Sequence, residues 1–215
     1  MGIVERRIRD RQNRVMEILD ASKRMFRSRG FIETTMNEIA TDSDLSRRTL
    51  YLYFHNKEEI LLTLAVQTLE QLLEETAKSR IQEMTGIERL INLATTYRNL
   101  YVADAGSFQF IPNFTNCVRA LGGSHPIVKK CENITNELIS IVSMMLQEGM
   151  EDHSVRKIDN PTKTAAILIT MIHSFIQSVD TDNDLLCIAL HISPSDFLDE
   201  SFSFITHYLS AKDKD

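Results

Sequence analysis

The chain has 215 residues, of which 43% are apolar and 25% are charged, and its formal net charge is −6. This is the composition of an ordinary soluble globular protein, and the acidic balance argues against a protein that coats nucleic acid over its whole surface. No apolar run reaches the roughly 20 residues that span a bilayer, and the N-terminal residues predict neither a signal peptide nor myristoylation. Three widely spaced cysteines predict reduced thiols in a cytoplasm.

The charges are unevenly distributed along the chain. Residues 1–30 contain nine Lys or Arg and four acidic residues, a net charge of +5. Residues 61–215 contain 12 basic and 20 acidic residues, a net charge of −8. This asymmetry predicts one end that faces nucleic acid and a body that repels it, although a solvated helix face would also explain it.

The first forty residues predict two helices. Apolar residues at helical spacing begin at Val15, and Gly30 is a good residue to end that helix in a left-handed conformation. Thr35 and Glu38 have the T-x-x-E spacing of a capping box, which opens a short second helix. The low glycine and proline content of the chain agrees with a mainly helical protein.

A third and a fourth helix follow at once. Ser46 can cap a helix of about two turns over residues 47–54, and Asn56 can cap a long amphipathic helix over residues 57–78. The second and third helices are joined by about four residues, which is helix-turn-helix spacing. The third helix begins with Arg47 and Arg48, which suit guanine edges and phosphates at a helix N-terminus.

The same residues resemble the TetR family of bacterial transcriptional regulators. The pieces T-x-x-x-I-A from Thr35, S-x-x-T-L-Y-x-Y-F from Ser46 and N-K-E-x-(I/L)-L from Asn56 stand in the family's order and spacing. The resemblance covers about residues 12–65. One departure is Asp44, where the family has Gly in the turn; Asp tolerates left-handed geometry better than most residues. Ser43 replaces the usual Ala.

The resemblance implies roles for individual residues. Base contacts are implied for Asn37, Arg47, Arg48 and Thr49, and phosphate contacts or positions beside the groove for Thr35, Tyr51, Tyr53 and Lys57. Ser46, which caps the third helix, is included among the DNA-binding residues, and Leu45, Leu50 and Phe54 match the core of the small domain. Packing is the alternative for the two tyrosines, and a solvated helix end is the alternative for the two arginines.

Helices are predicted to continue to the end of the chain. The expected segments are a helix opened by the capping box of Thr85 and Glu88, a stretch over 107–120 interrupted by Pro112, a long helix from Pro126, a polar loop over 149–160, an apolar helix over 163–180 opened by Asn160 and Pro161, a short helix over 185–190, and a last helix over 196–210 capped by Ser193. Helices that are apolar on most sides must be buried on most sides. We therefore expect a homodimer through the last two long helices, with a core helix in a monomer as the alternative.

No catalytic or metal-binding pattern stands out, so an enzyme is not predicted, and no cofactor is implied. His173 is expected to be a hydrogen-bonded core residue. A pocket for a small apolar or amphipathic effector is predicted from aromatic and Met residues on helices that should face one another, although such stripes often form core instead. The candidate lining residues are Tyr97, Phe108, Phe110, Phe114, Met144, Met145, Met171 and Phe175.

The sequence therefore predicts an all-α protein with a DNA-binding domain over residues 1–56 and a helical regulatory and dimerisation domain over residues 57–215. The expected function is a cytoplasmic, nucleoid-associated bacterial regulator, a repressor released from a palindromic operator by its effector. A DNA-binding protein of the same fold without an effector, controlled by a partner or acting as an activator or architectural factor, is the first alternative. A helical scaffold or enzyme with an incidental basic end is the second. No association with membranes is expected.

Overall fold

The computed structural model describes residues 2–78, 83–103, 111–179, 187, 189 and 191–211. The helices in chain order are α1 (Ile3–Arg29), α2 (Met36–Asp42), α3 (Arg47–Leu50), α4 (Lys57–Lys78), α5 (Gly86–Ala103), α6 (Ile111–Leu121), α7 (Pro126–Glu151), α8 (Pro161–Val179) and α10 (Pro194–Leu209). Within the described residues, the β pairing consists of one isolated bridge between Val155 and Ser210. The predicted all-α class is confirmed.

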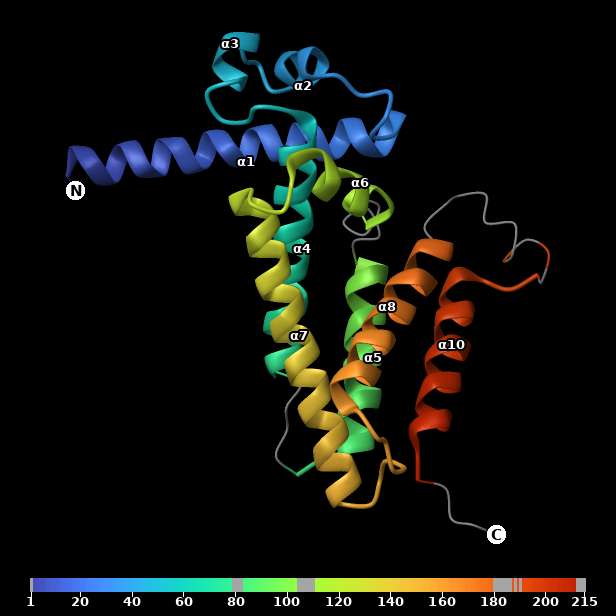
Figure 1. Ribbon diagram of the computed structural model, residues 1–215. Coiled ribbons are helices and arrows are strands. Elements are labelled where there is room, and N and C mark those ends of the chain that lie inside the picture. Colours follow the sequence, from blue (N-terminus) through green and yellow to red (C-terminus); the bar gives the residue numbers. More distant parts are fainter. Residues whose placement is uncertain are drawn as a thin grey trace.

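The helices form two regions that meet at the start of α4 (Figure 1). Helices α1, α2 and α3 lie across one end of the molecule, while α4, α5, α7, α8 and α10 run lengthwise below them. Helix α7 packs against α4, α5 and α8, and α10 packs against α5 and α8. No helix in the described part of the chain combines the length and apolar character that a bilayer crossing requires.

The hydrophobic core has two clusters, and α4 contributes to both. The N-terminal cluster includes Ile18, Ile39 and Leu50, together with Ile60 to Leu62 from the first turns of α4. The body cluster includes Leu72 further along α4 and residues of the remaining long helices. Because α4 joins the two clusters as one continuous helix of about 33 Å, the domain boundary at residue 57 stays a prediction.

Most of the predicted helix starts are confirmed by hydrogen bonds of the capping residues. Thr35 and Glu38 form the reciprocal pair that opens α2, and Asn56 Oδ1 accepts the Glu59 N–H at 2.8 Å at the start of α4. The corresponding caps at the later helices are those of Thr85 and Glu88, Asn160 and Ser193. These starts were predictable because each depends on residues three apart in the chain.

Two helix boundaries near the N-terminus differ from the sequence predictions. Helix α1 begins at Ile3 rather than near Val15. Its first turns, before Val15, do not pack against the hydrophobic core. Helix α3 has one turn rather than two: after Leu50 the chain tightens into bonds from Leu52 and Tyr53 to the carbonyls three residues earlier. This tightening returns the chain to the core at Phe54, which is buried.

Two boundaries in the body concern Pro112 and Gly149. Pro112 lies in the first turn of α6, where its missing N–H costs no helical hydrogen bond, and the part of the predicted stretch before Ile111 lies outside the described residues. Helix α7 continues through Gly149 to Glu151, because Gly149 packs closely against Gly86 of α5: a Cβ built on Gly86 would lie 2.2 Å from the Gly149 Cα. The predicted helix over 185–190 lies mainly outside the described residues, and the three cysteines are buried.

Candidate nucleic-acid interface and ligand cavity

Ion pairs and caps fix α2 against α1. The Thr35 hydroxyl accepts the Glu38 N–H at 3.3 Å, and the Glu38 carboxylate accepts the Thr35 N–H at 2.9 Å. Hydrogen bonds from Thr35, with a smaller contribution from Arg29, hold the pKa of Glu38 below its usual value. The Arg29–Glu38 pair at 2.6 Å and the Arg24–Asp42 pair at 2.7 Å join α1 to the two ends of α2.

A tight turn then sets the direction of α3. Asp44 has a φ of 53°, so it occupies the left-handed conformation expected for this position. The Leu45 N–H donates to the Ala40 carbonyl at 2.8 Å, and the buried Ser43 hydroxyl donates to the Ile39 carbonyl at 2.7 Å. Asp44 and these hydrogen bonds therefore form the turn without the glycine that is usual at this position in the TetR family.

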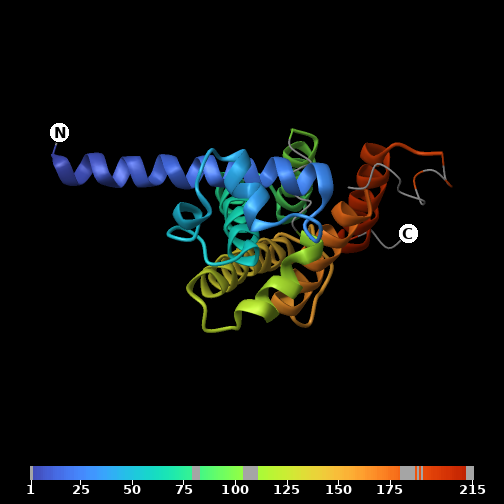
Figure 2. The ribbon, with the colours of Figure 1, turned by 90° about the horizontal axis from the view of Figure 1, so that it is seen from above.

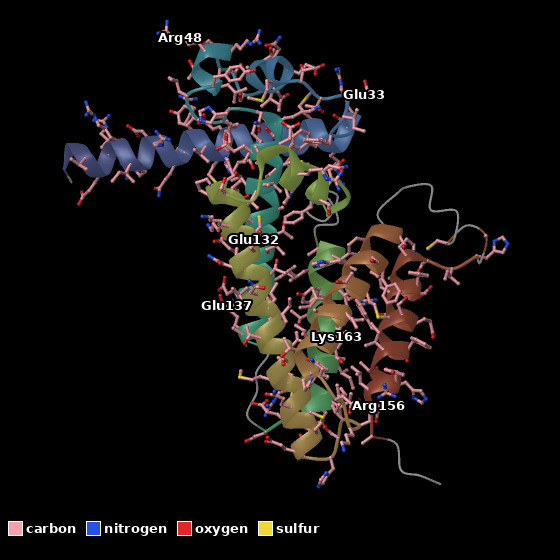
Figure 3. All side chains as sticks on the ribbon, viewed as in Figure 1. Glu33, Arg48, Glu132, Glu137, Arg156 and Lys163 are labelled. Carbon is pink, nitrogen blue, oxygen red and sulfur yellow. The ribbon has the colours of Figure 1, made fainter. Side chains whose placement is uncertain are left out.

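The first turn of α3 presents its cations outward. The Ser46 hydroxyl accepts the Thr49 N–H at 3.1 Å and caps the helix, while Leu50 on the opposite face is fully buried. Arg47 and Arg48 are exposed, and Figure 3 shows Arg48 at the outer end of the molecule, pointing away from the helical body. Within the described residues, neither arginine forms an ion pair with a carboxylate.

The other predicted DNA-binding residues surround this turn. Thr35, Asn37 and Ser46 are exposed and Thr49 is half-buried. Tyr51 is exposed beside Arg47, whose guanidinium carbon lies 5.6 Å from the Tyr51 ring centroid. Tyr53 is half-buried, with the Arg11 guanidinium 5.4 Å from its ring centroid. Helices α2 and α3 pack against each other, so these residues belong to one end of the molecule.

Lys57 has a different environment from the other predicted residues. Its ammonium donates to the carbonyls of Phe31, Ile32 and Thr34 at 2.8–3.0 Å, and it lies 4.7 Å from the Phe31 ring centroid. A lysine has three N–H donors, so a phosphate contact would require one of these bonds to break. These bonds hold the α1–α2 loop, and the phosphate contact expected for Lys57 from the resemblance stays a prediction.

A cavity of about 320 Å³ lies in the body, between α4, α6, α7 and α8. Its apolar lining includes Leu69, Leu72 and Ile139, and its polar lining includes Thr68, Thr135 and His173. None of the lining residues is a Lys, Arg, Asp or Glu. Cavities of this size and apolar character are typical of sites for small molecules, and a charged group buried here would find no opposite charge on the lining residues.

His173 is the titratable residue of this cavity. Burial lowers its pKa to about 4, so the imidazole is neutral at neutral pH. Its Nε2 atom is buried and has no hydrogen-bond partner among the described residues, contrary to the expectation of a hydrogen-bonded core histidine. An unsatisfied buried nitrogen costs free energy of folding. It could not be predicted from the sequence, because the partners of a core histidine depend on tertiary packing.

The predicted lining residues do not gather at this cavity. Phe114 lines it, but Tyr97 lines a separate space of about 30 Å³, Met171 lies on an outer groove, and Met145 is buried in the core. Met144 is half-buried, and Phe175 stacks edge-on against Phe197. Phe108 and Phe110 lie outside the described residues. The residues of α4 that line the cavity were not predicted, because the helical spacing of apolar residues along α4 is the same as that of an ordinary core helix.

Exposed arginines on the second helix of a helix-turn-helix, carried by a larger helical body, are typical of helix-turn-helix DNA-binding proteins. Residues 18–64 match the model of the bacterial regulatory proteins of the tetR family. The chain is 26% identical over 97 residues to the fatty acid metabolism regulator protein of Bacillus subtilis (strain 168). That match covers 45% of this chain and half the length of the relative.

Two solved structures share the fold over nearly the whole chain. A TetR-family transcriptional regulator from Agrobacterium tumefaciens has a TM-score of 0.71 at 12% identity, with 94% of this chain and 100% of that chain covered. Thermus thermophilus FadR, a TetR-family repressor in complex with lauroyl-CoA, has a TM-score of 0.57 at 21% identity, with coverage of 93% and 96%. Residues 18–64 therefore match the tetR family of bacterial regulatory proteins, and the chain as a whole shares the fold of these two structures.

Proposed function

We propose that the chain is a transcriptional repressor that binds a palindromic operator as a homodimer and releases it when a small effector fills the cavity between α4, α6, α7 and α8. The observation that carries this proposal is the connection between two sites. The exposed arginines of α3 lie at one end of the molecule, and α4 runs from the core beneath them to the cavity wall.

The exposed end supplies the DNA contacts. Arg47 and Arg48 can bind guanine edges bidentately when the first turn of α3 enters the major groove. Asn37 and Thr49 are the further residues proposed to contact bases. Thr35, Ser46, Tyr51 and Tyr53 are proposed to contact the phosphate backbone, because hydroxyl groups at the edges of a recognition helix position the protein on the duplex.

Helices α8 and α10 supply the proposed dimer interface. Ile167 of α8 and Phe204 and Tyr208 of α10 are 49%, 69% and 56% exposed, and all three line one groove. Exposed apolar residues gathered on one face are typical of an interaction site, and a two-fold dimer would cover them. Substitution of Phe204 by Asp is expected to yield monomers in size-exclusion chromatography and to abolish cooperative operator binding.

Helix α4 supplies the proposed route from effector to DNA. Ile60, Leu61 and Leu62 are buried in the N-terminal cluster, and Leu69 and Leu72 of the same helix line the cavity. A ligand that displaces the cavity end of α4 therefore acts on the core under α2 and α3. A coupling of about 1–3 kcal/mol would lower operator affinity roughly 5–150-fold.

The effector is proposed to be an apolar or amphipathic molecule such as an acyl thioester. The apolar lining supports this class, as do the two fatty-acid-related regulators named above. The cavity lining has no cation, so the acyl chain is the part that would enter, with the charged end of the molecule outside.

Selection of bound sequences from random duplexes tests the DNA-binding part of the proposal. The expected product is an inverted repeat with half-site centres about one helical turn apart. Lauroyl-CoA is then titrated against the selected duplex, with coenzyme A as the control, and is expected to weaken binding. An enriched palindrome that no acyl compound releases would favour partner-controlled regulation without an effector, and the absence of any enriched duplex would refute operator binding.

A further inference from the structure

The first part of α1 projects from the rest of the chain. Residues 4–13 are all exposed, including Val4 at 69% and Ile8 at 54%, and the helix joins the N-terminal cluster only from Val15 onward. Seen from above, this end of α1 extends well beyond the other helices (Figure 2). A short helical segment without packing is only marginally stable in water, so a bound partner would stabilise it.

The charge of this segment indicates the kind of partner. Its basic residues are Arg6, Arg7, Arg9, Arg11 and Arg14, and its acidic residues are Glu5 and Asp10. The Glu5 carboxylate is occupied in accepting the Gly2 N–H at 3.0 Å. Within the described residues, Arg14 is the one arginine of this segment with a carboxylate partner, Glu17. The segment is therefore strongly cationic and suits a polyanion.

Three of the arginines form a stripe that borders α3. Arg7, Arg11 and Arg14 are spaced i, i+4 and i+7, which places them on one face of the helix; we call them the arginine stripe. The Arg11 guanidinium lies 5.4 Å from the ring of Tyr53, just past α3. The stripe therefore continues the surface that carries Arg47 and Arg48, while Arg6 and Arg9 lie on the other side of α1.

We propose that the arginine stripe binds backbone phosphates of the operator outside the groove segment that α3 contacts. The stripe from Arg7 to Arg14 extends about 10.5 Å at 1.5 Å per residue, which is close to the major-groove width of about 12 Å. The stripe can thus reach the next phosphate backbone along the duplex. Arginine binds phosphate bidentately, and such contacts position the protein without reading sequence. This inference rests on the proposed operator binding.

Two matched double variants of the full chain test the stripe. Arg7→Ala with Arg11→Ala removes two charges from the stripe, and Arg6→Ala with Arg9→Ala removes two charges from the other face. Alanine favours the helix in both. Operator affinity is measured across a salt series, and phosphate contacts are mapped by ethylation interference. The stripe variant is expected to lose about 2 from the slope of log affinity against log salt, together with the phosphate contacts flanking the half-site.

The control variant is expected to keep those flanking contacts and most of the salt slope, and neither variant should alter base preference. Equal losses in the two variants would overturn the stripe in favour of diffuse attraction, and unchanged flanking contacts in the stripe variant would overturn it entirely. Wild-type binding to the selected duplex separates these results from a failure of the proposed function, because a wild-type protein that binds no duplex removes both proposals.

Discussion

The first turn of α3 and the helical body differ in how their cations are partnered. In the body, Arg89 pairs with Glu148, Arg98 lies 2.6 Å from Asp199 and Lys130 lies 2.7 Å from Glu70, so these charges join one helix to another. At the other end, Arg47 and Arg48 are exposed without a carboxylate partner among the described residues. Cations that are paired inside the fold contribute to stability, whereas cations left unpaired on a cap-held turn are available to a nucleic acid.

The largest effect expected is on operator affinity after the double substitution Arg47→Ala and Arg48→Ala. Each arginine is expected to contribute about 1–3 kcal/mol to discrimination between bases, so the affinity should fall by at least about 30-fold at constant melting temperature. Arg89→Ala is the matched substitution in the body, and it should lower the melting temperature without changing operator affinity. Fluorescence anisotropy measures operator affinity, and thermal unfolding measures stability. A large loss of stability in the double variant would show that Arg47 and Arg48 stabilise the fold, as the paired cations of the body do.

The second effect is on stability at the contact between α5 and α7. A Cβ on Gly86 would meet the Gly149 backbone at 2.2 Å, so Gly86→Ala should reduce the free energy of unfolding by about 3 kcal/mol through overpacking. Gly123→Ala is the control, because nothing lies within 4 Å of its added Cβ. Urea unfolding measures both variants, and equal stabilities would show that the helices can separate without cost.

The third effect is a pH dependence that comes from His173. Its pKa falls to about 4 in the folded protein from an ordinary value of 6.5, so the unfolded chain binds the proton more readily between these values. The stabilising contribution is therefore complete above pH 6.5 and is lost as the pH falls toward 4. Between pH 7 and pH 5 the free energy of unfolding should drop by about 2 kcal/mol from this residue.

His173→Phe tests the assignment, because its unfolding free energy should depend less on pH by that amount. Parallel urea titrations of the wild type and the variant at pH 7 and pH 5 give the difference directly. If the two proteins lose the same stability over this range, the histidine is solvated in the folded state and the description of the cavity is wrong.

The smallest effect is expected from Lys57→Met. Loss of the ammonium that binds three carbonyls should reduce the free energy of unfolding by about 1.5 kcal/mol and leave the salt slope of DNA binding unchanged. Lys129→Met, at an exposed position of α7, is the control. A salt slope reduced by about 1 would instead return Lys57 to the phosphate contacts that the family resemblance implied.

The DNA-facing end was predictable because its structure is determined locally. The caps of Thr35 and Ser46 and the left-handed Asp44 each depend on residues within a few positions in the chain. The first turns of α1 were missed because prediction followed the core-facing pattern, which stops at Val15. The continued spacing of Val4, Ile8 and Arg11 was the signal that could have extended the helix.

The body was predictable in its helices but not in its cavity. Phe114 and Phe175 have similar sequence contexts in apolar helices, yet the first lines the cavity and the second packs against Phe197. Which face of a helix borders a cavity depends on how neighbouring helices pack, and the sequence pattern of an apolar stripe is the same in both cases. The end of α7 was misplaced for the same reason, since Gly149 serves a contact with Gly86 from another helix.

The buried thiols restrict how a signal can enter the protein. Burial raises the pKa of Cys117 to about 12 and that of Cys131 to about 11, so both sulfurs stay protonated at neutral pH. The thiolate is the form that attacks peroxides and electrophiles, and neither residue supplies it. These two thiols are therefore not expected to react with oxidants, and the proposed displacement of α4 would come from a ligand that occupies space rather than from a covalent bond made or broken there.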